Sequence, residues 1–542
     1  MMRNLPVVLK HSLFAVVSGV MLWLSWPERG WTPLIFVALI PLLWIERHFE
    51  REKGVRNHFK VFGWFFLAML TWNSLSTWWI WNSTSVGTIV ALGLNSFLMT
   101  LVWQLFYITK RDHGPAIGYM SLPFYWIGFE YLHLNWEVSW PWLTLGNVFA
   151  VRTEWVQWYE YTGVLGGTLW IIGVNIILFQ ITKNLFTHSL LLKVRQANTI
   201  LLSFSALLLI AVPIDASYHM YERRQDQGTP VEVAVVQPNI DPYNEKFNGT
   251  SDEQLNKQLQ LASTVVDSQT QFVIGPETAL PDGIWEEELA QHPHTKRIRK
   301  FLGAFPGLNM ITGVTTFKRY ENGEKPSLTA RKFKNADSYY DVYNSALLLD
   351  SSENLQVYHK SKLVPGVEKM PYPQIFGFLE KFAIELGGTS GSLGIQTNRS
   401  NFISRSGVQV APAICYESIY GDFMSGYIRN GAQFIAVITN DGWWGNTPGY
   451  RQHMNYARLL AIQFRKSVAR SANTGISCFI NQRGDVVQRT QWWEPDAIRN
   501  TVYLNDKITF YARFGDYLGF VAAFISVSFF VFILLKRMLR FV

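Results

Sequence analysis

Eight long apolar stretches constrain how this chain of 542 residues can fold more than any other feature. Each is long enough, or nearly long enough, for a helix to cross ~30 Å of hydrocarbon. Hydrophobic residues make up 49% of the chain and it has 22 tryptophans, a composition typical of a membrane protein. We therefore predict eight transmembrane helices, around residues 10–26, 32–46, 61–80, 86–108, 115–133, 163–182, 197–214 and 516–535.

Two alternatives apply to individual stretches. The shortest ones could be helices of a buried core. The first could be a cleaved signal peptide, but Trp23-Leu-Ser-Trp26-Pro27 lacks the small residues of a cleavage site, so we interpret it as an anchor.

Basic residues predict the orientation of these helices. Lysine and arginine gather in alternate loops, and such loops belong to the cytoplasmic side. Arg29 and Arg152 are the exceptions on the other side. Both termini should therefore be cytoplasmic, with residues 217–513 on the opposite side. The orientation accounts for the net charge of +8, so a nucleic-acid partner is not expected. The basic residues of the cytoplasmic loops and tails are Arg3, Lys10, Arg47, Arg51, Lys53, Arg56, Lys60, Lys110, Arg111, Lys183, Lys193, Arg195, Lys536, Arg537 and Arg540.

Three regions follow: a transmembrane domain with seven helices (1–216), an outer domain (217–513) and an eighth helix with a cytoplasmic tail (514–542). In the outer domain, short apolar runs alternate with helix-like segments, which predicts an α/β fold. Periodicity leaves open whether two sheets pack together or one doubly wound sheet forms. Strands are expected at 231–237, 271–275, 309–315, 344–350, 355–359, 408–414 and 434–439, with helices at 252–266, 418–429 and 449–466 and a hairpin at 475–487.

An ionisable residue stands where three of these strands end. Glu277 follows the strand at 271–275, Lys360 follows 355–359, and Cys415 follows 408–414. Taken without its context, a cysteine is more often a small buried hydrophobe, but the other two strand ends with an ionisable residue favour a chemical role. A carboxylate that takes the thiol proton and a lysine that lowers the thiol pKa would together make the cysteine a nucleophile. The three residues therefore predict an acyl-transfer centre.

The second cysteine, Cys478, bears on this prediction. A disulfide between Cys415 and Cys478 in an oxidising compartment would remove the nucleophile. Cys478 lies in the alternating run Ile476-Ser-Cys-Phe-Ile480, and is most simply a core residue of a strand.

The motifs around these residues resemble those of the nitrilase superfamily. They are Gly275-Pro-Glu277-Thr-Ala-Leu-Pro281, Lys360-x-x-Leu363-Val-Pro365 with Glu368, and Ile414-Cys415-Tyr-Glu417. Further motifs resemble the membrane-embedded branch of that superfamily, the apolipoprotein N-acyltransferases. These are Thr439-Asn-Asp441-Gly-Trp-Trp-Gly445, Gln452-His453, Arg470-x-x-Asn473-Thr-Gly475 and Trp140-Pro-Trp-Leu-Thr-Leu-Gly146.

The resemblance implies an αββα sandwich attached to an eight-span membrane domain in the bacterial inner membrane, with the sandwich in the periplasm. It also implies the reaction, in which a fatty acyl chain passes from a phospholipid to the α-amino group of the diacylglyceryl-cysteine at the N-terminus of an apolipoprotein. The expected partners are thus a phospholipid acyl donor, diacylglyceryl-modified apolipoproteins and the membrane. No metal-ligand spacing or nucleotide motif is present in the sequence, so no cofactor or metal is expected.

By the same resemblance, Glu277 would be the general base, Lys360 the partner of the oxyanion and Cys415 the nucleophile. Glu368 and Glu417 would be supporting carboxylates, and Tyr416 would supply a backbone donor. Candidate substrate-binding residues are Trp443, Trp444 and Asn440.

Two departures from the family pattern stand near these residues. The loop after Lys360 reads Val364-Pro-Gly-Val-Glu368 and lacks the aromatic residue common there, and Gly275 stands where tryptophan is frequent. Lys362 competes with Lys360, because strand alternation would point both side chains to the same side.

Two other functions are compatible with these residues. A membrane-bound amidase would hydrolyse a C–N bond and use water to resolve the thioester. An inactive lipid-binding scaffold would keep the fold alone, but it would be expected to have lost at least one of the three ionisable residues.

Overall fold

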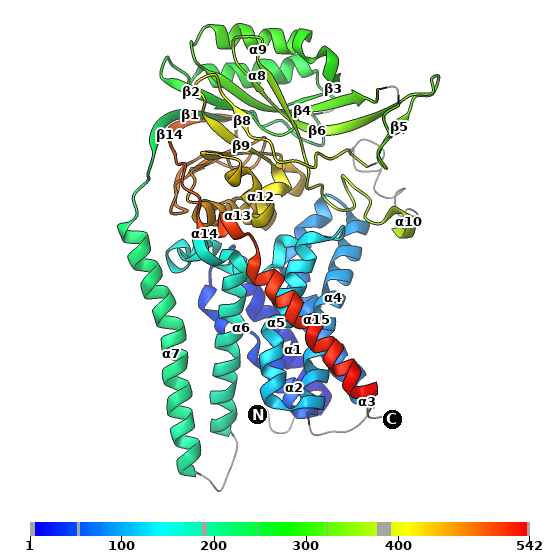
Figure 1. Ribbon diagram of the computed structural model, residues 1–542, viewed down its shortest axis with the longest axis vertical. Coiled ribbons are helices and arrows are strands. Elements are labelled where there is room, and N and C mark those ends of the chain that lie inside the picture. Colours follow the sequence, from blue (N-terminus) through cyan, green and yellow to red (C-terminus); the bar gives the residue numbers. More distant parts are fainter. Residues whose placement is uncertain are drawn as a thin grey trace. The chain divides into compact units, whose positions relative to one another are not determined.

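The computed structural model describes residues 6–50, 55–186, 192–246, 248–321, 323–376 and 392–538. The chain divides into two units (Figure 1). The first is helical and comprises Met1–Trp81, Ser85–Arg223 and Asp516–Val542. The second comprises Asn82–Thr84 and Arg224–Gly515 and contains the sheets.

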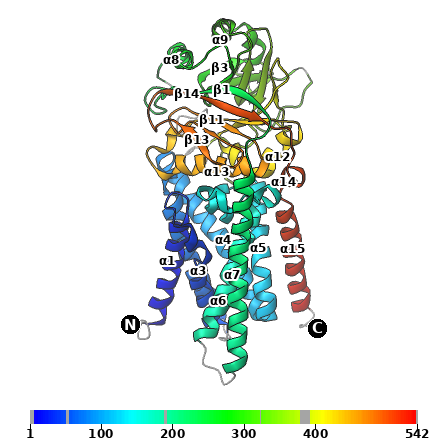
Figure 2. The ribbon, with the colours of Figure 1, turned by 90° about the vertical axis from the view of Figure 1, so that its left-hand side faces the viewer.

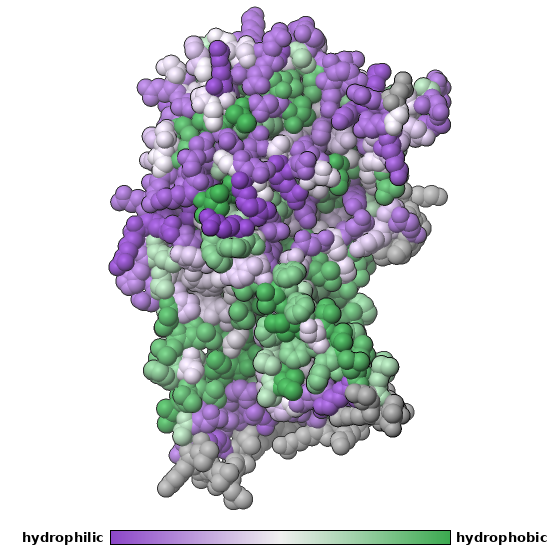
Figure 3. Space-filling model, viewed as in Figure 1, coloured by the Kyte–Doolittle hydropathy of each residue, from purple (hydrophilic) through white to green (hydrophobic). Residues whose placement is uncertain are grey.

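The helical unit covers every predicted apolar stretch with a helix. Apolar residues spread over the visible face of these helices (Figure 3). The long helices are α1 (Val7–Ser25), α2 (Ile40–Phe49), α3 (Val55–Thr77), α4 (Ser85–His113), α5 (Pro115–Asn135), α6 (Tyr159–Phe186), α7 (Leu192–Arg223) and α15 (Tyr517–Met538).

Six segments among the described residues are helical, long and apolar enough to cross a membrane. They are Val7–Ser25, Thr32–Phe49, Ser85–His113, Tyr159–Phe186, Arg195–Arg223 and Tyr517–Lys536. Helices α3 and α5, which cover the other two predicted stretches, do not reach that hydropathy. Both bury polar side chains, such as Asn73 in α3 and Glu130 and His133 in α5, and these lower the mean hydropathy. Six of the eight predicted spans are therefore supported.

A buried ion pair joins two of these helices. The ammonium of Lys110 in α4 lies 2.5 Å from the carboxylate of Glu46 in α2, and neither side chain is exposed. Buried charges are tolerated when they are paired, so this contact fixes α2 against α4.

The second unit contains two sheets. The larger has the strand order β14-β1-β2-β4-β6-β5, with β3 added to β4 and β7 to β6. Its strands are β1 (Thr229–Gln237), β2 (Thr270–Ile274), β3 (Leu280–Trp285), β4 (Asn309–Arg319), β5 (Arg331–Lys332), β6 (Tyr339–Leu349), β7 (Leu355–His359) and β14 (Asp496–Leu504). The smaller has the order β13-β12-β11-β10-β9-β8. Its strands are β8 (Phe402–Ile403), β9 (Gln409–Ile414), β10 (Phe434–Thr439), β11 (Val468–Ala472), β12 (Cys478–Ile480) and β13 (Val486–Arg489).

The two sheets pack face to face between two layers of helices. The rings of Phe272 in β2 and Phe434 in β10 meet edge to face at 5.4 Å, within the core between the sheets. Helices α8 (Ser251–Ser263) and α9 (Pro293–Gly303) cover the larger sheet. Helices α12 (Gly421–Arg429) and α13 (Pro448–Phe464) cover the smaller one (Figure 2). This is the αββα sandwich that the resemblance implied, and it decides between the two arrangements that periodicity left open.

Candidate active site

Three strand ends bring the predicted carboxylate and ammonium together and place the thiol beside them. Lys360 follows β7 directly, Glu277 lies three residues after β2, and Cys415 follows β9. The Lys360 Nζ lies 2.9 Å from Glu277 Oε1 and 2.7 Å from Glu368 Oε1. Lys360 and Glu277 are only 1% and 6% exposed, so little water screens this ion pair.

A network of donors holds the Glu277 carboxylate. Asn344 donates from its side chain to Oε1 at 2.7 Å, and the backbone N–H of Asn440 donates to Oε2 at 3.1 Å. Buried polar groups are normally hydrogen-bonded, and here the Asn344 amide and the Asn440 N–H each donate to a Glu277 oxygen. Both carboxylate oxygens therefore have fixed partners.

The backbone at Glu277 is also fixed. Thr278 has a φ of 49°, in the left-handed region that side chains rarely adopt. Gly313 in β4 lies against this turn, because a Cβ there would come within 2.3 Å of the Thr278 nitrogen. The buried Lys246 donates to the Glu277 carbonyl at 3.2 Å. The sequence analysis missed Lys246, which stands in a turn after β1 where polar residues are common.

Charge at the site favours an ionised carboxylate and a protonated lysine. Burial raises the pKa of Glu277, but the Lys360 ammonium, the Asn344 hydrogen bond and the Lys246 charge together lower that pKa below the ordinary value. Burial likewise opposes the charge on Lys360, while Glu277 and Glu368 raise its pKa well above the usual value. The two groups therefore stay charged near neutral pH.

Cys415 is held as a protonated thiol in a strained backbone. Its φ is 51°, again in the left-handed region. Burial and the negative charge of Glu277 raise the pKa of the thiol, and Lys360 only partly offsets them. The ground state is thus a neutral thiol near a carboxylate that can accept its proton. Both cysteines are free, and Cys478 is buried in β12.

The two supporting carboxylates have different contacts. Glu368 accepts from Lys360 through Oε1 and from the Val364 N–H, at 2.8 Å, through Oε2. Glu417, which is fully buried, accepts from the backbone N–H groups of Ser361 at 2.6 Å and Ile414 at 2.8 Å. Glu368 therefore orients Lys360 directly, whereas Glu417 ties the residue after Lys360 to the residue before Cys415.

The remaining predicted residues surround the site less directly. Tyr416 is 2% exposed and packs against Tyr420. Trp443 and Trp444 are half-buried at the end of a short turn, and Asn440 contacts Glu277 through its backbone. The carbonyl oxygens of Trp443 and Trp444 accept from Ser83 and Asn82, which also belong to the second unit.

Lys362 does not share the position of Lys360. Strand β7 ends at His359, so the alternation of side chains does not continue to residue 362. The Lys362 ammonium lies 4.8 Å from the ring centre of Tyr420. Lys360 is therefore the lysine paired with Glu277.

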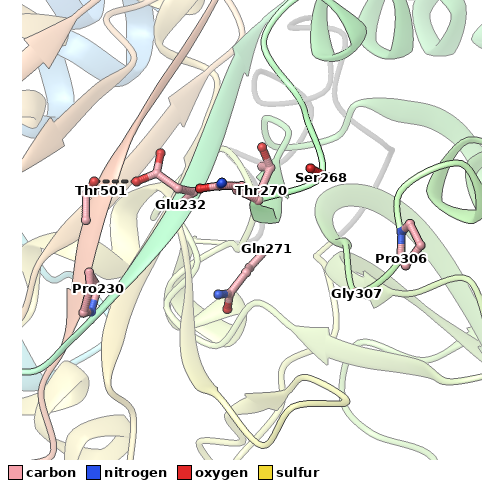
Figure 4. Close-up of a pocket in the computed structure, with 9 residues that line it drawn as sticks. Pro230, Glu232, Ser268, Thr270, Gln271, Pro306, Gly307 and Thr501 are labelled. Atoms are coloured by element: carbon pink, nitrogen blue, oxygen red, sulfur yellow. Dashed lines mark hydrogen bonds between the residues drawn. The ribbon is translucent and has the colours of Figure 1, made fainter.

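A separate pocket of the second unit lies elsewhere and contains none of these residues. Pro230, Glu232, Thr270, Gln271 and Thr501 are among its lining residues, and Glu232 accepts a hydrogen bond from Thr501 (Figure 4). Its volume is ≈ 520 Å³. Among the described residues, no group of three or more His, Cys, Asp or Glu side chains could hold a metal ion.

Comparisons with known proteins cover nearly the whole chain. Residues 18–177 match the family described as apolipoprotein N-acyltransferase N-terminal domain, and residues 232–507 match the carbon-nitrogen hydrolase family. The apolipoprotein N-acyltransferase of Chlorobaculum tepidum is 31% identical over 526 residues, which cover 94% of this chain and 93% of that protein. The enzyme of the same name from Geobacter metallireducens is 25% identical, over 93% of this chain and 91% of its own length.

The similarity to solved structures is more distant. Saccharomyces cerevisiae Nit3, a member of branch 10 of the nitrilase superfamily, is 12% identical with a TM-score of 0.36. The alignment covers 52% of this chain and 92% of that protein.

Proposed function

Since this chain belongs to the apolipoprotein N-acyltransferase family, we propose that Glu277, Lys360 and Cys415 are the residues that carry out its reaction. The family assigns the activity, acyl transfer in lipoprotein maturation, to a multi-pass membrane protein. The observation that supports the three residues is the buried Glu277–Lys360 ion pair beside the strained Cys415.

In the first half-reaction, Glu277 removes the thiol proton and the Cys415 sulfur attacks an ester carbonyl of the phospholipid. A C–S bond forms, the ester C–O bond breaks, and the proton on Glu277 passes to the departing lyso-phospholipid oxygen. General bases of this kind contribute roughly 10²- to 10⁴-fold to a rate. The product is a thioester on Cys415.

The tetrahedral intermediate carries a negative oxygen that needs donors. Lys360 supplies an ammonium, and the backbone N–H of Tyr416 supplies a hydrogen bond on the residue after the nucleophile. Donors that are already in place when charge develops stabilise the transition state most, because no reorganisation is needed.

In the second half-reaction, the α-amino group of the apolipoprotein attacks the thioester. The C–N bond forms as the C–S bond breaks, and the amine proton passes by way of Glu277 to the Cys415 sulfur. The cycle is ping-pong, because the lyso-phospholipid leaves before the amine reacts.

The membrane arrangement belongs to the same proposal. Eight helices would span the bilayer, seven within 1–216 and one within 514–542. Both termini would be cytoplasmic, and the catalytic domain, 217–513, would lie in the periplasm. An acyl chain resists leaving the bilayer by ~0.8 kcal/mol per CH₂, so membrane attachment keeps the site near its lipid substrates.

The transfer assay that tests this uses the full chain in detergent micelles with phospholipid and a diacylglyceryl lipopeptide. We expect the lipopeptide to gain one acyl chain on its amino group. Cys415→Ala should abolish this gain, and Glu277→Gln should slow it by roughly 10²-fold or more. Glu288→Gln, at an exposed position of the same unit, is the matched control and should act as the wild type does.

Two outcomes would contradict the proposal. Transfer that persists in Cys415→Ala would remove the thioester from the mechanism. Release of free fatty acid with no acylated lipopeptide would favour a hydrolase of the amidase kind.

A further inference from the structure

A buried chain of polar side chains ends on the carbonyl oxygen of Cys415. His453 in α13 places its Nε2 3.0 Å from that oxygen, and the Ser418 hydroxyl donates to it at 2.7 Å. Neither side chain is more than 1% exposed. Two donors thus converge on one peptide group, the one that joins the proposed nucleophile to Tyr416.

Asp441 fixes the orientation of the histidine. Its Oδ1 lies 2.9 Å from His453 Nδ1, and its Oδ2 accepts from Arg470 at 2.6 Å. Arg470 is fully buried and also donates to the Ile476 carbonyl at 2.6 Å. Burial opposes the charge on Asp441, but Arg470 and His453 lower its pKa below the ordinary value. The carboxylate is therefore ionised and anchored at both oxygens.

The partners of the two ring nitrogens settle which atoms donate. The Cys415 carbonyl oxygen and the ionised Asp441 carboxylate can only accept, so His453 makes these two hydrogen bonds by donating from Nε2 and from Nδ1. The Ser418 oxygen also lies 3.0 Å from Nε2. The Ser418 hydroxyl directs its own proton to the same carbonyl. Two donors thus hold the Cys415 carbonyl: the N–H of His453 from α13 and the O–H of Ser418 from the turn Cys415–Ile419.

Holding this carbonyl also holds the Tyr416 N–H. The two bonds belong to one planar peptide group, in which C=O and N–H point in opposite directions. A φ of 51° at Cys415 is costly for a residue with a side chain, so the surroundings must impose it. Hydrogen bonds to the carbonyl also polarise the amide and strengthen its N–H as a donor.

We propose that the Asp441–His453 pair, with Ser418, is a positioning device for the oxyanion hole, acting through the Cys415–Tyr416 peptide. This inference rests on the proposed roles of Cys415 and of the Tyr416 N–H. His453 acts on the reaction by aiming and polarising the donor that stabilises the tetrahedral intermediate. It does not act as a base toward the thiol, because its Nε2 is directed at the carbonyl.

Two reactions of the same thiol separate this role from a structural one. Acylation by a phospholipid passes through an oxyanion and needs the donor. Alkylation by iodoacetamide is a direct displacement at carbon with no oxyanion, so it needs only the thiol and its base. A positioning residue for the oxyanion hole should therefore affect the first reaction and spare the second.

The experiment uses the full chain in detergent micelles and follows the Cys415 peptide by mass spectrometry. One sample receives phospholipid with an alkyne-tagged acyl chain, and the other receives iodoacetamide. In His453→Gln we expect the rate of acylation to fall roughly 10- to 100-fold. This is no more than the rate loss that follows removal of a complete oxyanion donor, because the Tyr416 N–H is still present. Alkylation should stay within about twofold of the wild type.

Further variants sharpen the result. Asp441→Asn should slow acylation in the same way, because the ring loses its anchor. His294→Gln is the matched control. His294 is also buried and its Nε2 lies 3.2 Å from Asp252 Oδ1, but it belongs to α9, which covers the larger sheet. This variant should leave both reactions unchanged. If His453→Gln does not fold, Ser418→Ala removes the other donor with less disturbance and should show the same selective loss.

Three outcomes would overturn the inference: an equal loss of acylation and alkylation, unchanged acylation in His453→Gln and Ser418→Ala, or an equal effect of His294→Gln. Failure of the proposed function is distinguishable, because it would show as absence of the tagged acyl group on Cys415 in the wild type.

Discussion

The chemistry proposed for the site depends on one residue, Glu277. It lies between two buried lysines, since Lys360 pairs with its carboxylate and Lys246 donates to its backbone carbonyl. Lys246 is almost fully buried, and burial lowers its pKa to about 8. Both ammonium groups are therefore positively charged at neutral pH and stabilise the ionised form of Glu277.

This electrostatic arrangement predicts the acid limb of the pH profile. Acylation needs ionised Glu277, whose pKa lies below the ordinary value, so the rate in the wild type should fall only as the pH drops below the usual carboxyl range. Lys246→Met removes a positive charge and should raise the Glu277 pKa, shifting the acid limb upward by about one pH unit. The initial rate of Cys415 acylation against pH measures this.

Lys257→Met is the control for that shift. Lys257 also donates to a backbone carbonyl, that of Asn239, at 3.1 Å. It should leave the acid limb in place. An equal shift in both variants, or no shift in Lys246→Met, would contradict the electrostatic role of Lys246.

At the scale of elements, Glu417 connects strand ends from the two sheets. One oxygen accepts from the Ser361 N–H, beyond β7, and the other accepts from the Ile414 N–H at the end of β9. Tyr358 adds a hydroxyl donor at 2.6 Å. The Glu417 carboxylate has four lone-pair positions and can accept from all of these donors. A glutamine amide at this position would point its own NH₂ group at a backbone N–H, and neither group could accept.

Glu417→Gln should therefore destabilise the second unit. Leaving one buried N–H without an acceptor costs roughly 1–3 kcal/mol. For a domain of this size that corresponds to a fall in Tm of roughly 2–10 °C. Thermal unfolding of the purified protein in detergent measures it, with the exposed Glu288→Gln as control. An unchanged Tm would show that the two strand ends are held by other contacts.

Close approach of helices in the first unit gives a second prediction at this scale. A Cβ at Gly19 of α1 would lie 2.6 Å from the Ala68 carbonyl oxygen of α3, whereas nothing lies within 4 Å of a Cβ at Gly93 of α4. Gly19→Ala should lower the Tm, since overpacking costs typically 1–3 kcal/mol. Gly93→Ala should not. Equal effects would mean that α1 and α3 do not pack as closely as described.

Several elements follow from the sequence, and others do not. The bounds of β7 and β10 agree with the predicted strands 355–359 and 434–439, because both runs are rich in aliphatic and aromatic residues and each is followed by a polar residue, Lys360 or Asn440. Strand β3 was not predicted, since Pro281 and Gly283 indicate a turn there. Strand β14 was not predicted either, because it lies at one edge of the larger sheet and four of its nine residues, Asp496, Arg499, Asn500 and Thr501, are polar.

The candidate site could also be predicted only in part. The motifs identified Glu277, Lys360 and Cys415 by resemblance, but Glu277 and Lys360 are 83 residues apart in the chain, so their ion pair became evident only in the folded structure. Lys246 and Asn344 stand in no motif that the sequence analysis used. Their roles as neighbours of Glu277 depend on how β1 and β6 lie beside β2 and β4.

For the whole molecule, the orientation in the membrane is the prediction to test. In a Cys415→Ala background, whose remaining Cys478 is buried, single cysteines replace Ser351 of the second unit and Gln196 near the start of α7. A membrane-impermeant maleimide added to spheroplasts should label Ser351→Cys and not Gln196→Cys, because basic residues near Gln196 indicate the cytoplasmic side. Permeabilised cells, in which both should react, are the control. Labelling of Gln196→Cys alone in intact spheroplasts would reverse the proposed topology.

The central claim is that Cys415 carries the acyl chain as a thioester. Mass spectrometry of the purified full chain after incubation with phospholipid tests it most directly. The account predicts one acyl group on the Cys415 peptide that hydroxylamine removes and that disappears in Cys415→Ala. An acyl adduct that persists in Cys415→Ala, or no adduct on Cys415 in a preparation that still acylates lipopeptide, would contradict it.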